Sequence, residues 1–158
     1  MLWAILAAIS LGGAYLMQTA RESDARLTLA RTVWGEARNQ GEAGMRAVAA
    51  VVMNRVGDPR WPDTVAGVCK QHTDTGVYQF TAWAPTNPNR DKMLGMTAES
   101  SGPAWDTAWR IAGKALDGTL IDPTGGATHY VNPVIAGIPW WAEDMTRKAT
   151  IGDHVFFA

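Results

Sequence analysis

The feature that most constrains this 158-residue chain is the segment 45–56, which is apolar almost all the way around a helix. It reads Met-Arg-Ala-Val-Ala-Ala-Val-Val-Met-Asn-Arg-Val, and Gly57 and Pro59 follow it as stop signals. A helix with so few polar positions is stable when other elements surround it, so we expect it at the centre of a core. The chain is long enough for one sizeable core, and a composition of 47% hydrophobic and 18% charged residues is typical of a globular domain.

A second helix is predicted just before this one, over residues 27–38. Ser23 is a plausible N-cap for it, and the Asn-Gln-Gly sequence at 39–41 supplies stop residues. Apolar residues recur with helical spacing at Leu27, Ala30, Val33, Trp34 and Ala37. Glu36 therefore falls in the last turn of a helix that leads into the buried helix, and we expect it at the mouth of a cleft lined by the core.

The position of Glu36 favours an unusual protonation state. Carbonyl groups at the end of a helix carry partial negative charge, and packing beside Trp34 would remove hydration, so both effects raise the pKa of the carboxyl group. A carboxylic acid that stays protonated near neutral pH can donate a proton to a leaving oxygen. A solvated surface glutamate is the alternative, and the pattern of residues alone leaves it open.

The rest of the chain mixes short helices and short strands. We expect helices over residues 62–69 and from a cap at Ser101, with Pro103 in the first turn, to Gly118. Strands are predicted at 77–82, 127–131 and 151–157, with turns at 85–90 and 122–126. These elements predict an α+β fold, a mostly helical single domain with a small β-sheet.

Seven segments, in the expected order, resemble the cell-wall hydrolase family that includes the spore-cortex-lytic enzymes. They are residues 30–38, 44–55, 61–68, 79–81, 122–127, 129–133 and 151–156. That family is similar to lytic transglycosylases and goose-type lysozymes, which cleave the sugar backbone of peptidoglycan. The resemblance implies a lysozyme-like single domain with the small β-sheet beside the active-site cleft. It also implies that Glu36 is the general acid and base of a cleavage between N-acetylmuramic acid and N-acetylglucosamine.

The resemblance also suggests substrate-binding residues. It places Gln79, Phe80 and Thr81 along the cleft, with Gln79 and Thr81 on one side of the strand as hydrogen-bond partners for sugar hydroxyl or acetamido groups. It places His129 and Tyr130 beside the cleft, where they would position the acetamido group or orient Glu36. Structural roles in the sheet are the alternative for each of these residues.

Further candidates are polar or aromatic side chains near these segments. Asn132 adds a polar group after the second strand, and Trp83, Trp140 and Trp141 offer aromatic faces on which sugar rings can pack. Core packing is the alternative for the tryptophans.

The sequence gives little support to a metal site, a serine or cysteine nucleophile or a nucleic-acid-binding site. Cys69 and His72 form one Cys-x-x-His pair without further ligands at metal-site spacing, so we predict no metal and no cofactor. The chain has no Gly-x-Ser-x-Gly motif, and the apolar surroundings of Cys69 should raise its pKa and make it a poor nucleophile. A net charge of −1 and no basic stripe argue against a nucleic-acid partner.

The first residues form a separate segment. Residues 2–17 are uncharged and almost entirely apolar, but a helix of that length is about 24 Å long and falls short of the roughly 30 Å hydrocarbon core of a bilayer. We therefore predict a signal peptide or signal anchor at 1–20, with membrane association through residues 2–17, and a catalytic domain at 21–158. A core helix is the alternative. The prediction places the protein in the cell envelope, on the extracytoplasmic side of the membrane.

Several questions stay open at the level of sequence. Transglycosylation and hydrolysis would use the same glutamate, so a lytic transglycosylase and a muramidase are both compatible with it. An N-acetylmuramoyl-alanine amidase and an inactive wall-binding module are more distant alternatives. We expect a monomer that acts on peptidoglycan strands, either a phage endolysin or a bacterial wall-remodelling enzyme.

Overall fold

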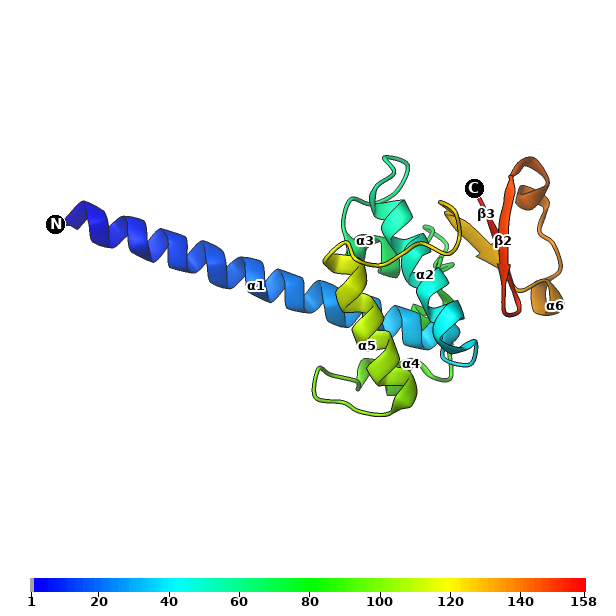
Figure 1. Cartoon of the computed structure of the whole chain (residues 1–158), viewed down its shortest axis with the longest axis horizontal. Helices are drawn as coiled ribbons and strands as arrows, with labels where there is room; N and C mark the ends of the chain where they lie inside the picture. Colours follow the sequence, from blue (N-terminus) through cyan, green and yellow to red (C-terminus); the bar gives the residue numbers. More distant parts are fainter. Residues whose placement is uncertain (1) are drawn as a thin grey trace.

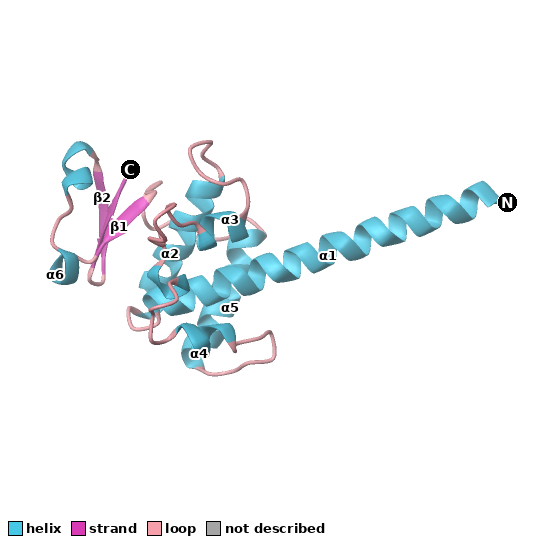
Figure 2. Cartoon of the chain, turned by 180° about the vertical axis from the view of Figure 1, so that it is seen from behind, coloured by secondary structure: helices cyan, strands magenta, loops and turns pink. Residues whose placement is uncertain are grey.

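The computed structural model describes the backbone of residues 2–158 and the side-chain environments of residue 14 and residues 16–158. Helices form one body, and a three-stranded sheet stands at one side of it (Figure 2). This arrangement confirms the predicted fold class, mostly helical with a small sheet. The elements in chain order are α1 Leu2–Ala37, α2 Gly41–Val56, α3 Val65–Lys70, η1 Thr81–Trp83, α4 Arg90–Leu94, α5 Pro103–Leu116, β1 His129–Val131, α6 Pro133–Ala136, η2 Trp140–Asp144, β2 Arg147–Ile151 and β3 His154–Phe157.

Helix α2 is the central helix that its sequence predicts. It packs against α1, α3 and α5, and its side chains are buried on nearly all sides. The buried residues include the run Ala47–Val52, and the helix ends at Val56 with Gly57 as C-cap. One of its charged residues, Arg55, is also buried, with an exposed fraction of 4%.

Helix α1 is a single continuous helix that extends well beyond the helical body (Figure 1). Its residues that are described as buried lie between Thr28 and Ala37, and it ends at Ala37, as the stop residues 39–41 predict. The prediction that Ser23 caps the start of a helix is wrong. Residues 18–22 contain no glycine or proline to interrupt the helix, so it runs through Ser23, whose side chain is exposed.

The predicted signal or anchor segment, 1–20, falls largely on residues outside those whose side chains are described. Within the described part, Leu16 and Met17 are 68% and 67% exposed, so these two residues are not in the core. No helix in the described part of the chain combines the length and apolar character needed to cross a bilayer.

The shorter helices deviate slightly from their predicted starts. Helix α3 begins at Val65, not at residue 62, because the Thr64 side chain caps it by accepting a hydrogen bond from Gly67 N at 3.1 Å. Helix α5 has Pro103 in its first turn, as predicted, but Gly102 occupies the N-cap position in place of Ser101. The φ angle of Gly102 is +130°, which few other residues adopt. The sequence did not predict α4.

The sheet is antiparallel, with strand order β1-β3-β2. Strands β1 and β3 confirm two of the predicted strands, and β2 was not predicted. The predicted strand at 77–82 is wrong: its segment contributes one isolated bridge, between His72 and Tyr78, and then turns into the 3-10 helix η1. The segment has strand-like alternation, but no neighbouring strand lies along it to pair with.

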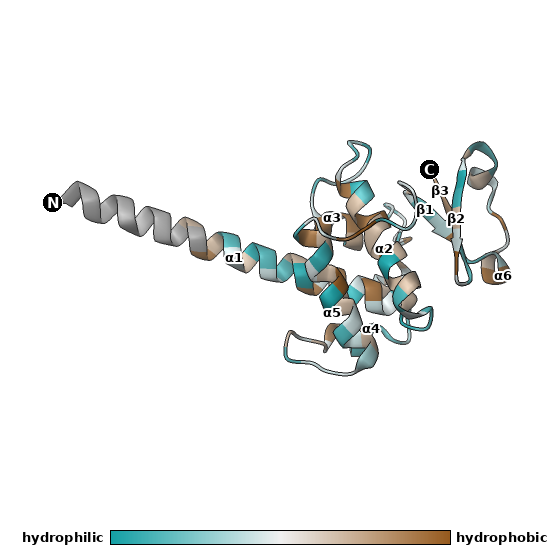
Figure 3. Cartoon of the chain, viewed as in Figure 1, coloured by the Kyte–Doolittle hydropathy of each residue, from teal (hydrophilic) through white to brown (hydrophobic). Residues whose placement is uncertain are grey.

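The two faces of the sheet have different environments. Tyr130 and Phe156 pack toward the helical body, where Phe156 joins Ala47 and Val51 of α2. Val131 and Phe157 lie on the other face, covered by the chain around η2. Figure 3, in which the ribbon is coloured by hydropathy, shows a hydrophilic stretch of α1 where this helix joins the helical body. The sheet thereby directs Tyr130 toward the end of α1.

Candidate active site

Glu36 lies in the last turn of α1, as predicted, and its carboxylate accepts three hydrogen bonds. The backbone N–H of Ala82 donates to Oε1 at 2.7 Å, and the Thr81 hydroxyl donates to the same oxygen at 3.2 Å. The Tyr130 hydroxyl donates to Oε2 at 2.8 Å. Residues from α1, η1 and β1, far apart in sequence, therefore meet at one carboxylate.

Gly35 makes this close approach of α1 and η1 sterically feasible. A Cβ atom at position 35 would lie 2.5 Å from the Cβ of Ala82 and 3.1 Å from the sulfur of Met93. The Ala82 methyl group is fixed to the backbone and has no torsion with which to move aside. The turn is also fixed from its other end, because the Trp83 indole N–H donates to the Thr32 hydroxyl of α1 at 2.8 Å. A residue without a side chain thus precedes Glu36 because the Ala82 N–H must reach the carboxylate.

Burial raises the pKa of Glu36, which agrees with the predicted direction. The Ala82 N–H, the Tyr130 and Thr81 hydroxyls and the charge of Arg55 act in the opposite direction, since each stabilises the ionised form. The desolvation effect is the largest of these, so the net shift favours the acid form more than it is favoured in a glutamate exposed to water. The donors are already in place to stabilise the carboxylate once its proton has left.

Tyr130 is held firmly beside Glu36. Its ring packs against Phe156, Phe80 and His154, at centroid distances of 5.6, 6.3 and 5.1 Å. Burial and the neighbouring Glu36 raise the pKa of Tyr130 well above its ordinary value. The hydroxyl group therefore stays protonated and available as a hydrogen-bond donor.

His129 lies on the other face of β1, because successive residues of a strand alternate. Its ring packs between Trp61 and Trp141, at centroid distances of 5.4 and 5.2 Å, and its Nδ1 lies 2.9 Å from the Thr128 hydroxyl. Of the two neighbours predicted beside the cleft, the structure therefore brings Tyr130 to Glu36 and directs His129 away from it.

The remaining predicted substrate-binding residues separate into buried and exposed groups. Phe80 and Trp83 are 0% and 5% exposed, so both predictions are corrected: these rings pack in the core and present no open face to a sugar. Asn132 has a structural partner, since its side chain accepts a hydrogen bond from Val134 N and caps α6. Gln79 and Thr81 are exposed.

The two tryptophans at the start of η2 differ in solvent exposure. Trp140 is 80% exposed, whereas Trp141 is partly buried against His129 and Phe157. An open aromatic face is therefore available at Trp140, which stays a candidate for sugar contact.

Arg55 is the residue near Glu36 that the sequence interpretation missed. Its Nε donates to the carbonyl oxygen of Thr128 at 2.7 Å, and its guanidinium lies over the ring of Trp61. Burial lowers the pKa of Arg55 to about 10, so it is charged at neutral pH. The sequence did contain an indication of its importance, because arginine is rarely found in a helix that is otherwise apolar and buried.

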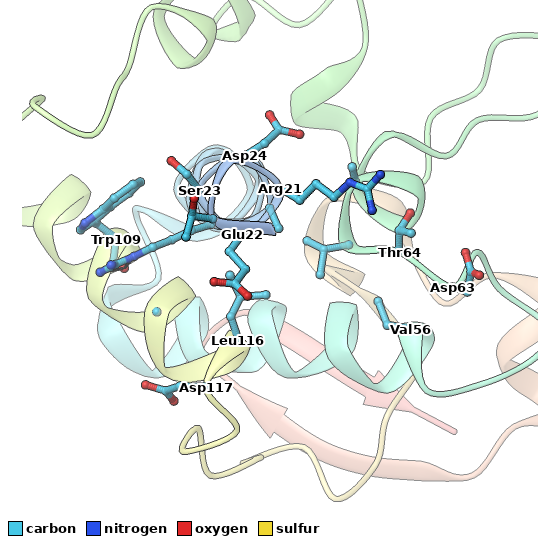
Figure 4. Close-up of a pocket in the computed structure, with 16 residues that line it drawn as sticks. Arg21, Glu22, Ser23, Asp24, Val56, Asp63, Thr64, Trp109, Leu116 and Asp117 are labelled. Carbon is cyan, nitrogen blue, oxygen red and sulfur yellow. Dashed lines mark hydrogen bonds between the residues drawn. The ribbon is translucent and has the colours of Figure 1, made fainter. Parts of the chain in front are cut away.

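A pocket of about 1070 Å³ opens where α1 leaves the helical body (Figure 4). Residues of α1 between Thr19 and Arg26 line it together with parts of α5 and the start of α3. A smaller pocket of about 180 Å³ lies beside Glu42 and Arg110. Glu36 lines neither pocket, so the cleft expected at Glu36 stays a prediction. The carboxylates of Glu22 and Asp24 in the larger pocket are exposed, unlike that of Glu36.

Other reactive groups offer little competing chemistry. Burial raises the pKa of Cys69 to about 12, in agreement with the predicted direction, so its thiol is a poor nucleophile. Across the described residues, no group of three or more His, Cys, Asp or Glu side chains is placed to hold a metal ion.

Comparison with known proteins adds to this geometry. The profile of the family described as Cell Wall Hydrolase matches residues 39–157. The chain belongs to the cell wall hydrolase family. Within the family it is similar to the spore cortex-lytic enzyme of Halalkalibacterium halodurans, with 38% identity over 129 residues, and to that of Bacillus subtilis, with 35% identity over 135 residues. These alignments cover 81% and 85% of the chain.

The chain spans 33% and 37% of the length of those two relatives. It covers much more of the solved catalytic domains of this family. The crystal structure of the catalytic domain of the Bacillus cereus SleB protein aligns with a TM-score of 0.64 and 32% identity, over 86% of this chain and 91% of that domain. The catalytic domain of the germination-specific lytic transglycosylase SleB from Bacillus anthracis gives the same TM-score at 31% identity, over 85% and 93%. These matches confirm the lysozyme-like fold class.

Proposed function

We propose that this chain cleaves the glycan backbone of peptidoglycan between N-acetylmuramic acid and N-acetylglucosamine, as a lytic transglycosylase with Glu36 as its single acid and base. The observation that carries the proposal is the Glu36 carboxyl group, whose pKa burial raises while three donors surround it. Membership of the cell wall hydrolase family and the similarity to SleB catalytic domains support the choice of substrate.

In the first step, protonated Glu36 donates its proton to the glycosidic oxygen, and the bond to the anomeric carbon of muramic acid breaks. The Ala82 N–H can only donate, so Oε1 stays an acceptor before and after this transfer. The Tyr130 hydroxyl can turn, accepting from the acid form and donating to the carboxylate. We therefore assign the mobile proton to Oε2. The neighbouring N-acetyl group of the sugar stabilises the positive charge on the anomeric carbon.

In the second step, the Glu36 carboxylate takes the proton of the C6 hydroxyl of the muramyl residue. The C6 oxygen attacks the anomeric carbon and closes a 1,6-anhydro ring, and Glu36 returns to its acid form. Muramidase action would differ only in the nucleophile, because a water molecule would take the place of the C6 hydroxyl.

The surroundings of Glu36 favour a scheme with one carboxyl group. Glycosidases that use two carboxylates keep them roughly 5 to 10 Å apart across the sugar. Among the described residues, the side chains that hydrogen bond to Glu36 are those of Thr81 and Tyr130, and the charged side chain that acts on it is Arg55. Two neutral hydroxyl groups and one cation around Glu36 suit a carboxyl group that acts first as an acid and then as a base in the same reaction cycle.

Glu36→Gln tests the proposal, because the amide keeps the shape of the side chain and cannot transfer the proton. We expect the variant to fold and to release no soluble fragments from purified peptidoglycan. Glu42→Gln is the matched control, since Glu42 is an exposed glutamate paired with Arg110 at 2.9 Å, and it should retain activity. Fragment release by Glu36→Gln at the wild-type rate would refute the assignment.

Two alternatives give different products in the same assay. An amidase would create free amines or lactyl ends without breaks in the glycan strand. An inactive wall-binding module would sediment with peptidoglycan and release nothing. Either result from the wild-type protein would refute the proposed cleavage.

We further propose that the protein acts in the cell envelope, with residues 1–20 as a signal peptide or anchor and residues 21–158 as the catalytic domain. Fusion of residues 1–20 to a reporter that is active only after export tests this arrangement.

The substrate contacts that we retain are Gln79, Thr81 and Trp140, because their side chains are exposed. A monomer encoded by a phage or by a bacterium fits this proposal equally.

A further inference from the structure

We propose that Arg55 is a positioning residue for the glycan cleavage, fixing the hydrogen-bond donors around Glu36 and supplying a permanent positive charge that acts on the carboxylate. The inference rests on the proposed function and adds to it a residue on a different helix from the acid.

Arg55 contacts both chain segments that supply the donors to Glu36. Its Nε donates to the Thr128 carbonyl oxygen at 2.7 Å, two residues before Tyr130. Its guanidinium carbon lies 5.1 Å from the ring centroid of Phe80, the residue that precedes Thr81 and Ala82. One rigid, planar group thus links the start of β1 to the start of η1.

Trp61 also contacts the guanidinium. The guanidinium carbon lies 4.1 Å from the centre of the Trp61 ring, within the range of a cation–π interaction. The guanidinium is thus fixed by two aromatic rings and one carbonyl oxygen, and it has few other orientations available. A displacement of Arg55 would move Tyr130 and the Ala82 N–H relative to Glu36 at the same time.

A buried cation without a carboxylate partner is costly, so its presence here needs a reason. Arg55 forms no salt bridge among the described residues, and its buried Nη1 has no hydrogen-bond partner. Packing alone would be served by a methionine of similar length. The charge of Arg55 and the nearby Glu36 carboxylate stabilise each other.

Three titratable groups near Glu36 are neutral at neutral pH. Burial raises the pKa of Tyr130 on β1 and of Cys69 on α3, and burial lowers the pKa of His154 on β3, whose ring packs against Tyr130. Two further cations, Arg38 just after α1 and Lys92 of α4, lie over the ring of Trp34. The charge of Arg55 lowers the pKa of Glu36.

This charge has a defined effect on the reaction. Glu36 must be protonated in the free enzyme, so activity falls as the pH rises through the pKa of Glu36. Arg55 lowers that pKa against the effect of burial, and it stabilises the carboxylate that forms in the first step. Removal of the charge should therefore move the alkaline limb of the pH profile to higher pH and slow proton donation.

The test compares Arg55→Met, Arg55→Lys and the control Arg60→Met in the pH profiles of kcat and kcat/KM on purified peptidoglycan. Arg60 is an exposed arginine of the loop before α3, paired with Asp58, and its loss should change neither profile. For Arg55→Met we expect the alkaline limb to move up by roughly one pH unit and kcat to fall about tenfold. Below pH 7, where the lysine is charged, Arg55→Lys should leave the alkaline limb of the pH profile where it is in the wild type. Its kcat should fall several-fold, because lysine lacks the planar guanidinium.

An Arg55→Met protein with the wild-type limb would overturn the inference. If Arg55→Met does not fold, as judged by circular dichroism, Arg55→Lys decides the question: wild-type kcat in that variant would overturn the positioning role. A second readout needs no substrate. The carboxyl carbon of Glu36, identified by nuclear magnetic resonance from its absence in Glu36→Gln, should titrate at higher pH in Arg55→Met than in the wild type. Failure of the proposed function would instead appear as fragment release by Glu36→Gln, whatever the Arg55 variants do.

Discussion

Replacement of Tyr130 by phenylalanine removes one oxygen from the site and leaves the ring. The ring keeps its contacts with Phe80, Phe156 and His154, so the free energy of unfolding should change little. What is lost is the 2.8 Å hydrogen bond from the Tyr130 hydroxyl to the Glu36 carboxylate.

The size of the effect follows from the kind of bond that is lost. A hydrogen bond to a charged group contributes about 1.5–3 kcal/mol, and this one stabilises the ionised form of Glu36. Because the same hydroxyl can accept a weaker, neutral hydrogen bond from the acid form, the difference between the two forms is about 1.4 kcal/mol, and the pKa of Glu36 should rise by roughly one unit in Tyr130→Phe. If about half of this difference is felt in the transition state for proton donation, kcat should fall roughly threefold.

The assay is the release of soluble fragments from purified peptidoglycan between pH 4 and pH 9. Activity requires protonated Glu36, so a higher pKa moves the loss of activity on the alkaline side to higher pH. Tyr78→Phe is the matched control, because Tyr78 packs on His72 and makes no contact with Glu36. A folded Tyr130→Phe protein with the wild-type kcat and pH profile would refute the role of this hydroxyl group.

Three further predictions concern the surroundings of the site. Gly35→Ala places a methyl group 2.5 Å from the Ala82 methyl group, so we expect a lower melting temperature together with lower kcat, and an unchanged variant would contradict the packing argument for Gly35. Trp140→Ala should raise KM without lowering kcat, because the exposed ring is a candidate for sugar contact remote from proton transfer, and an unchanged KM would remove it from the candidates. Cys69 should react with thiol reagents much more slowly than free cysteine in the native protein, because its thiol is buried and its pKa is about 12, and rapid labelling without unfolding would disagree with its placement.

The sequence predicts the parts of the fold that depend on local spacing. The burial of α2, the end of α1 at Ala37 and the position of Glu36 in the last turn follow from helical periodicity and from the stop residues. The start of α1 cannot be predicted in this way, because a cap residue such as Ser23 begins a helix only where the residues before it are not helical. Nothing in residues 18–22 makes them leave it.

The parts that were missed depend on contacts between distant segments. Residues 77–82 have the alternation of a strand, yet the chain turns at Thr81 and delivers the Ala82 N–H to Glu36. Strand β2 was not predicted because three of its five residues are exposed and two, Arg147 and Lys148, are charged; it forms through pairing with β3.

The candidate site shows the same limit. Strand alternation separates His129 from Tyr130, but only the register of β1 against β3 tells which of them faces α1. Arg55 could be noticed as a charge in a buried helix, although its partners, Thr128 and Phe80, become known only with the tertiary structure.

The most direct measurement is mass spectrometry of the glycan fragments that the wild-type protein and Glu36→Gln release in water enriched in heavy oxygen. Lytic transglycosylation by Glu36 predicts muramyl ends one water lighter than reducing ends, free of heavy oxygen, from the wild type and none from the variant. Reducing ends that carry one heavy oxygen would show that the nucleophile is water and not the C6 hydroxyl. The same fragments from Glu36→Gln would contradict the central claim that this one partly buried acid carries the chemistry.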